Sequence, residues 1–472
     1  MKYNLLLFVL CSLGFSAHAQ EKYSLEDCIN IAMQNDYDLK NKNSEIQISE
    51  RVYRQSKSEK YPSLTTGFSQ GLHLGRNIDP YSNHFVDQTF NSARLALSSE
   101  FTLFDGKVTK NTSRLKRENK AINELELESL SLELKKIVTL AYLELILKQQ
   151  TLALKYEQKD ILQIQLDRIA LLDSTQAELD SISTDVIAQL ENEKYYIVQE
   201  KAGLTVARNR LLALMNLRTD TEIDVEEPLV PNLLSSGIDN RQDHILKLSY
   251  LRQKELEIQR SNLNLLIKKG AKKPYLSLNG GLNSIYSSLV NTKINTLDGE
   301  PLEFLQESRS EFVQIDGQNI PLNRLVIQPK TEEVKFGYFS QLFSNSGLSF
   351  ALNFSYPIYD KQSRNTEIQV AKIEKIMAQN DLMRTQSEVQ AELTEIKSSI
   401  YSSEDQYLQA LKQEETQSKA FDLSLRRFEK GLISFSEFNQ AKINLERAKS
   451  NILQNRYTRY FYNLIYRYYT GK

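Results

Sequence analysis

The sequence predicts a mainly α-helical chain with a few short β-strands, in which a unit of helix, strand, strand, long helix and helix occurs twice. Three observations support this fold class. Two long blocks contain almost no glycine or proline and repeat their apolar residues at steps of three and four. Short stretches between them alternate apolar with small or polar residues. The same pieces recur in the same order in both halves of the chain.

Residues 1–19 have the pattern of a secretory signal peptide. Lys2 supplies the positive end, residues 5–13 form an apolar core too short to span a bilayer, and an A-x-A cleavage site ends at Ala19. Cys11 lies within this segment, and because the residue before it is large, we expect no lipid anchor there. The mature chain is expected to begin directly after the cleavage site and to lie outside the cytoplasm.

The composition gives no indication of a nucleic-acid partner, a metal site or a cofactor. The chain has 59 basic and 60 acidic side chains, a formal net charge of −1. After the signal peptide Cys28 is the one cysteine, so it has no partner for an intrachain disulfide, and the four histidines are scattered. No run of 18 apolar residues follows, so any membrane insertion must use strands.

The two helical blocks run from Lys107 to about Ala170 and from Arg364 to Phe428. Blocks of about 60 to 70 residues, at 1.5 Å per residue, predict rods of about 100 Å. Their periodicity is typical of coiled coils and is clearest at Leu127, Leu130, Leu134, Ile137, Ala141 and Leu145, and at Val389, Leu393, Ile396 and Ile400.

Four strands are expected, at about 62–74, 93–104, 274–286 and 347–358. Apolar residues on one face and small or polar residues on the other are typical of a transmembrane strand around a wet lumen. One such stretch alone would also fit a soluble sheet, but two pairs beside long helices, with no other sheet to join, favour the membrane. Four strands cannot close a barrel, and open edges are forbidden in lipid, so the chain must oligomerise; three copies would supply twelve strands.

The repeat sets the expected boundaries. The first repeat covers 20–225, a crossover with two prolines covers 226–237, and the second repeat covers 238–472. An insertion at about 287–346 separates the two strands of the second repeat, and its polar part, 291–335, predicts a long exposed loop or a small cap. Both strand pairs are expected at one end of the rods and both helical turns about 100 Å away at the other.

The stretch "FEKGLISFSEF" predicts the turn of the second repeat. Gly431 can adopt the left-handed conformation that ends a helix. Ser434 and Glu437 follow as S-x-x-E, the capping box that begins a returning helix.

The corresponding stretch of the first repeat, "DSTQAELDSISTDV", has no glycine. Leu179 occupies the matching position, so this turn must be built differently. We expect Asp180, Ser181 or Ser183 to cap the returning helix.

These pieces, in this order and spacing, resemble the TolC family of outer-membrane efflux proteins over essentially the whole mature chain. The matching stretches are "YSLEDCINIAMQNDYDLK" (23), "GRNIDPYSNHF" (75), "FTLFDGK" and "YPIYDKQ" at the strand-to-helix corners, and "FEKGLISFSEFNQAKINLERAK" at the second tip. The resemblance implies a homotrimer with a 12-stranded β-barrel in outer-membrane lipid on a 12-helix periplasmic α-barrel. It also implies a periplasmic adaptor (membrane fusion) protein and an inner-membrane RND or ABC-type pump as partners.

The resemblance further implies a periplasmic constriction at the tips. The family acid six residues after the glycine corresponds to Glu437; three copies would form a ring of like charge that favours cations, although the capping role alone also explains this residue. The family aspartate matches Asp185, but Phe428 replaces its tyrosine partner, Ile433 replaces a basic residue, and Gln440 replaces a second acid. We therefore expect a constriction held more by packing than by a polar latch.

The tip turns at Gly431, Ser434, Leu179 and Ser183 would then be the place where the adaptor docks. The leading interpretation is a passive exit duct. The sequence specifies neither its cargo nor the class of its pump. A periplasmic coiled-coil scaffold or adaptor without a pore would explain the helices but not the strands. An enzyme is disfavoured because the sequence offers no nucleophile–base pair, metal cluster or phosphate loop.

Overall fold

The structure is a computed structural model that describes residues 22–169, 176–228, 249–298 and 300–470, with backbone only for 176–182 and 307–310. The predicted signal peptide and most of the predicted crossover lie outside these residues. The chain divides into two compact units. The helical unit comprises Met1–Tyr53, Arg114–Leu265 and Val370–Lys472, and the sheet unit comprises Arg54–Ser113 and Leu266–Gln369.

The described chain is mainly helical. Its long helices are α4 (Val108–Ile169) and α8 (Ser363–Glu429), of 62 and 67 residues, so each extends for about 90 to 100 Å. The other helices are α2 (Leu25–Asn35), α3 (Tyr37–Ser58), α5 (Gln176–Leu214), α6 (Ser249–Gly270), α7 (Tyr338–Ser344) and α9 (Phe435–Thr470). Among the described residues no helix combines the length and the apolarity needed to cross a membrane.

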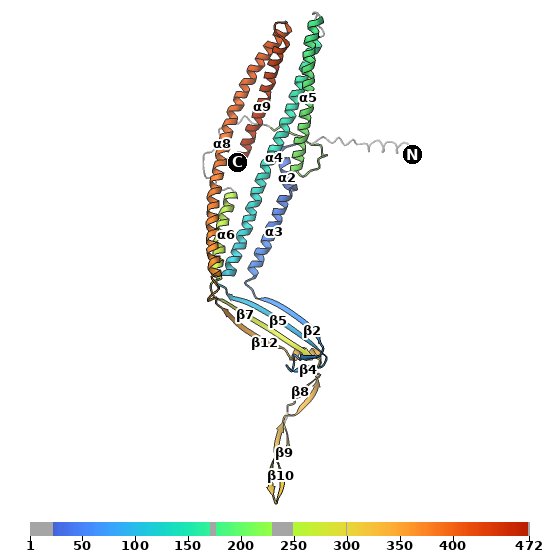
Figure 1. Cartoon of the computed structure of the whole chain (residues 1–472), viewed down its shortest axis with the longest axis vertical. Helices are drawn as coiled ribbons and strands as arrows, with labels where there is room; N and C mark the ends of the chain where they lie inside the picture. The colour runs from blue at the N-terminus through green and yellow to red at the C-terminus, as the bar shows by residue number, and fades with distance from the viewer. Residues whose placement is uncertain (1–21, 170–175, 229–248, 299, 471–472) are drawn as a thin grey trace, which may run out of the picture. The chain divides into compact units, whose positions relative to one another are not determined.

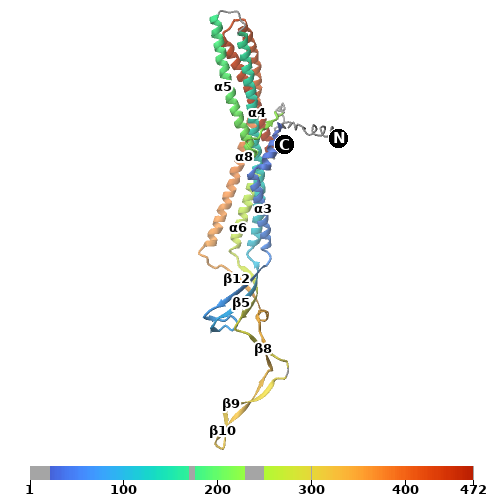
Figure 2. The ribbon, with the colours of Figure 1, turned by 90° about the vertical axis from the view of Figure 1, so that its right-hand side faces the viewer.

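The helical unit is held together by apolar residues from α4, α5, α8 and α9, which run alongside one another (Figures 1 and 2). Its largest cluster surrounds Tyr142 of α4, which is 1% exposed and donates a hydrogen bond to the Glu226 carbonyl at 2.5 Å. Cys28 of α2 is fully buried in this cluster. A parallel pairing of β1 (Lys22–Tyr23) with β6 (Asp224–Val225) joins the beginning and the end of the first repeat.

The sheet unit contains one four-stranded antiparallel sheet with the order β12-β7-β5-β2, drawn side by side in Figure 1. These strands are β2 (Ser63–His73), β5 (Phe90–Phe104), β7 (Tyr275–Ser287) and β12 (Gly347–Ser355). The pairing of β5 with β7 joins the two repeats, so β2 and β12 are left as the edges.

The two faces of this sheet differ in character. Leu352 pairs with Leu278, and Leu278 pairs with Phe101, so one face carries a row of large apolar side chains. In β12 that row is highly exposed, at 64 to 71%: Leu348, Phe350, Leu352 and Phe354. The opposite face carries mostly serine, threonine, asparagine, alanine and glycine.

The strand-to-helix corners of the two repeats are built alike. Asp105 accepts the backbone N–H of Thr109 at 2.5 Å at the start of α4, and Asp360 accepts that of Arg364 at 3.2 Å at the start of α8. Gly106, at the first corner, has φ +70°, and a Cβ there would lie 2.3 Å from the Gly270 carbonyl oxygen. Only glycine fits this close approach of two backbones.

The insertion of the second repeat is more ordered than predicted. The sequence indicated a long exposed loop or a small cap, but the segment forms two antiparallel ribbons and the short helix α7. The ribbons pair β8 (Thr292–Thr296) with β11 (Thr331–Lys335), and β9 (Leu302–Ile315) with β10 (Gln318–Gln328). Strands β8, β9 and β10 are labelled in Figure 2. The missed signal is Asp316-Gly317, whose φ angles of 53° and 83° suit a tight hairpin turn between alternating stretches. A similar small hairpin, β3 (Arg76–Ile78) with β4 (Phe85–Asp87), lies between β2 and β5.

Candidate functional site at the helical tips

The second tip is closed by a left-handed glycine. Helix α8 ends at Glu429, and Gly431 has φ +67°. The Leu432 N–H then donates to the Arg427 carbonyl at 2.9 Å, which satisfies one of the carbonyls left open at the helix end. The cap predicted at Gly431 is therefore confirmed.

The returning helix begins with the predicted capping box. The Ser434 N–H donates to the Glu437 carboxylate, and the Glu437 N–H donates to Ser434 Oγ, both at 3.2 Å. Glu437 lies in the first turn of α9, where the helix dipole favours a negative charge. Its side chain is exposed, and so is that of Gln440, three residues later.

Aromatic packing holds the second tip together. Phe428 stacks on Phe438 with ring centroids 5.0 Å apart and planes at 14°, and Phe435 lies 6.0 Å from Phe428. Ile433 packs in the same cluster, which also contains residues of α4 and α5, among them Val186. Phe438 is fully buried but was not predicted; its signal was the three-residue spacing from Phe435 on one helix face.

The first tip differs from the prediction. Helix α5 already begins at Gln176, so Leu179 and Ser183 lie within the helix, and the turn and caps expected at 179–183 are wrong. The physical reason is that "QAELDSIS" has no glycine to stop a helix and begins with good helix formers. The connection from α4 falls within 170–175, outside the described residues. Asp185 is exposed on α5, beside Val186 of the apolar cluster.

A buried ion network links α4, α5 and α9 in the helical unit. Lys442 and Glu193, 1% and 2% exposed, form an ion pair of 3.2 Å, and Lys155 lies 3.5 Å from the same carboxylate. Lys155 also pairs with Glu446. Burial lowers the pKa of Lys442, and attraction to Glu193 opposes that shift. The four-residue spacing of Lys442 and Glu446 on one helix face is visible in the sequence, but their burial is not.

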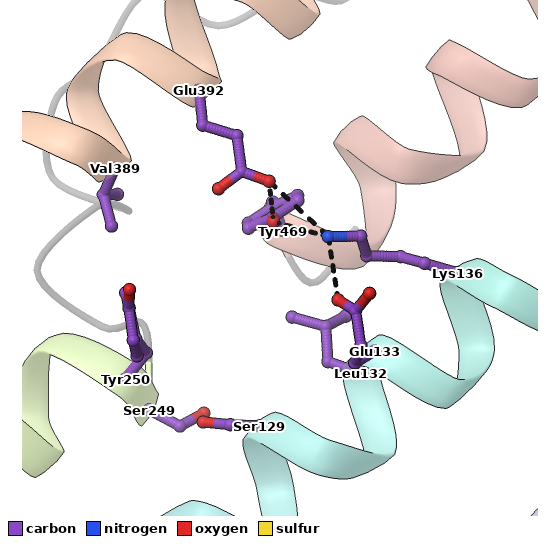
Figure 3. Close-up of a pocket in the computed structure, with 9 residues that line it drawn as sticks. All are labelled: Ser129, Leu132, Glu133, Lys136, Ser249, Tyr250, Val389, Glu392 and Tyr469. Carbon is purple, nitrogen blue, oxygen red and sulfur yellow. Dashed lines mark hydrogen bonds and ion pairs between the residues drawn. The ribbon is translucent and has the colours of Figure 1, made fainter. Parts of the chain in front are cut away.

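A second polar cluster, drawn in Figure 3, joins α4, α6, α8 and α9 around a cavity of about 320 Å³. Lys136 Nζ lies 3.0 Å from Tyr469 Oη, 3.1 Å from Glu133 and 3.5 Å from Glu392. Tyr469 in turn donates to Glu392. Each charge in this cluster is paired within it, which indicates a connection between helices and not a ligand site. Across the described part of the chain, no group of three or more histidine, cysteine, aspartate or glutamate residues could hold a metal ion.

Known proteins match this chain in part of its sequence and in its fold. Residues 331–461 match the family model described as outer membrane efflux protein. No match was found among curated protein sequences.

Solved structures match over nearly the whole chain. A membrane protein from Pseudomonas aeruginosa gives a TM-score of 0.74 at 15% identity, covering 95% of this chain and 92% of that chain. The outer membrane protein VceC from Vibrio cholerae gives 0.71 at 12% identity, covering 95% and 96%. The open state of the Neisseria gonorrhoeae MtrE outer membrane channel gives 0.70 at 15% identity, covering 94% and 88%. The predicted resemblance is thus confirmed: residues 331–461 match the outer membrane efflux protein family, and the chain has the fold of TolC-family channels.

Proposed function

We propose that this protein is the outer-membrane exit duct of a tripartite efflux or type I secretion system. It would conduct substrates passively from an inner-membrane pump across the periplasm and the outer membrane. The observation that carries this proposal is the four-stranded sheet, which has one exposed apolar face, one polar face and two open edges. The family match over residues 331–461 supports the same function.

The sheet supports a homotrimer. The outer edges of β2 and β12 carry backbone groups without a strand partner in the described chain, and such groups cost several kcal/mol each in lipid. Three copies would pair each β2 with a neighbouring β12 and close a barrel of twelve strands, with a 12-helix α-barrel beneath it. The apolar row of β12 would then face lipid, and the polar face would line a wet lumen.

The tips would form the periplasmic constriction and the docking site of the adaptor. Three copies of Glu437 would give a ring of negative charge, with Gln440 and Asp185 beside it and the packing of Phe428 and Ile433 holding the helices together. The loop that carries Gly431 and Ser434 would meet a periplasmic adaptor protein, which connects the duct to an RND or ABC-type pump. The duct would carry out no chemistry of its own.

A periplasmic scaffold without a pore is the other candidate. It would leave the row Leu348, Phe350, Leu352 and Phe354 exposed to water, and contiguous apolar surface of this kind normally marks a lipid or protein contact. No feature of the described chain favours the scaffold over the duct.

Planar-bilayer recording of the purified mature protein tests the proposal. We expect stable, cation-selective single-channel steps, together with heat-modifiable trimers in the outer-membrane fraction. A well-folded protein that never inserts would overturn the duct and leave the scaffold.

A further inference from the structure

The four-stranded sheet contains two charged side chains, and both are on β5. Strands β2, β7 and β12 have no lysine, arginine, aspartate or glutamate, whereas β5 has Arg94 and Glu100. A charge inside a strand of a sheet that is otherwise apolar or neutral is costly unless it faces water or a partner. Arg94 and Glu100 are therefore expected to face water or a partner of opposite charge.

The register places both charges on the polar face. Arg94 pairs with Ser69 of β2 and Ile285 of β7, and Glu100 pairs with Ser63 of β2 and Asn279 of β7. The flanking Leu95 points to the opposite, apolar face because successive side chains of a strand alternate.

The two charges do not neutralise each other. Six residues of strand separate them, which corresponds to about 20 Å. Glu100 accepts a hydrogen bond from Tyr275 Oη at 3.3 Å, and Tyr275 Oη also lies 3.2 Å from Thr102 Oγ1. Arg94 is exposed and forms no ion pair with any described residue.

We propose that Arg94 and Glu100 form two rings of opposite charge in the lumen of the trimer, and that the Arg94 ring attracts anionic groups of the cargo as they leave. This inference rests on the proposed duct. With strands tilted by about 40°, the rings lie about 15 Å apart along the pore. That spacing exceeds the Debye length of about 8 Å at physiological salt, so each ring acts on ions separately.

The order of the rings follows from the chain. Arg94 is nearer the start of β5, which follows the β3–β4 hairpin, and Glu100 is nearer its end, which leads into α4. The end of the barrel at the β3–β4 hairpin would be the outer mouth. A guanidinium binds carboxylates and phosphates in a bidentate manner, so the cargo favoured at the outer ring carries such groups.

Block of single channels by tripolyphosphate, added to the side of the outer mouth, tests this assignment. We expect tripolyphosphate to block the wild-type channel, and Arg94→Gln to weaken the block by at least roughly tenfold, within the range by which a ring of one sign concentrates counter-ions. Arg94→Lys should keep most of the block, and Glu100→Gln should strengthen it. Arg76→Gln, the same change in the β3–β4 hairpin outside the sheet, is the comparison for a cation at the same mouth and should weaken the block less than Arg94→Gln does.

The outcomes separate this inference from the proposed duct. If the wild-type channel conducts and tripolyphosphate blocks it no better than it blocks the Arg94→Gln channel, the ring is overturned and the duct remains. A wild-type protein that forms no channel overturns both. Should Arg94→Gln fail to insert, Arg94→Ser takes its place, and a block as strong in that variant as in the wild type also overturns the ring.

Discussion

The two helical tips connect equivalent pairs of helices, yet they are built differently. The second tip has a left-handed glycine, a capping box and an aromatic stack, so its turn is fixed at Gly431. The matching stretch of the first repeat has no glycine, and α5 extends back to Gln176. One glycine thus determines where the second turn lies, whereas in the first repeat helix propensity accounts for α5 continuing through residue 179.

The side chains that the two repeats bring to the tips also differ. α8 and α9 contribute Phe421, Phe428, Phe435 and Phe438, whereas α4 and α5 contribute aliphatic residues such as Leu162 and Leu190. The first repeat contributes to the ion network instead, because the central carboxylate, Glu193, comes from α5. The second repeat therefore defines the geometry of its tip, while the first repeat supplies the buried carboxylate that pairs with Lys442 of the second.

The largest expected effect comes from removing that charge. Glu193→Ala leaves the buried Lys442 without its carboxylate, and breaking a buried pair in this way costs about 3 to 5 kcal/mol. Thermal or denaturant unfolding of the purified protein measures the change. Glu191→Ala is the matched control, since this exposed carboxylate pairs with Lys194 of its own helix and should change stability by less than about 0.5 kcal/mol. Equal effects of the two variants would show that the network does not hold the repeats together.

The next effect tests the glycine of the second tip. Gly431→Val should destabilise the protein by about 1 to 2 kcal/mol, because a residue with a Cβ is strained in the left-handed region. A Cβ at this position meets no atom within 4 Å, so the cost is conformational and not a clash. Gly431→Asn should recover most of the stability, since asparagine tolerates this conformation. An equal loss for asparagine and valine would contradict the left-handed cap.

A smaller effect tests the first tip. If Leu179 lies inside α5, Leu179→Gly should be less stable than Leu179→Ala by about 1 kcal/mol, the difference in helix propensity. Both variants lack the leucine side chain, so the comparison isolates the backbone. If the glycine variant were more stable than the alanine variant, the chain would turn at position 179, as the sequence predicted, and not continue as a helix. Equilibrium unfolding of both variants measures the sign of the difference in stability.

Much of the fold could be predicted from the sequence, because periodicity reports which face of an element is buried. The two long helices, the four strands of the sheet and the capping box at Ser434 all follow from local patterns. The hairpin turn at Asp316-Gly317 also had a local signal, but the polar composition around it favoured a loop.

The parts that could not be predicted depend on contacts between residues far apart in the chain. Lys442 and Glu193 are separated by 249 residues, and nothing in the sequence near either one distinguishes a buried ion pair from a solvated charge. The prediction for the first tip was wrong for a different reason. Its position was transferred from the second repeat, although the glycine that fixes the turn there has no counterpart at Leu179.

The smallest expected effect on stability gives the sharpest test of the second tip, because it separates the two roles of Glu437. Glutamine can replace glutamate in a capping box, so Glu437→Gln should leave the unfolding transition nearly unchanged. It removes the charge, however, so the cation selectivity of the channel, measured from the reversal potential in a salt gradient, should fall. Ser434→Ala is the converse control: it removes the cap, at a cost of about 1 kcal/mol, but keeps the charge and should keep the selectivity. Unchanged selectivity in Glu437→Gln would leave this residue with its capping role alone and would place the constriction of the pore elsewhere.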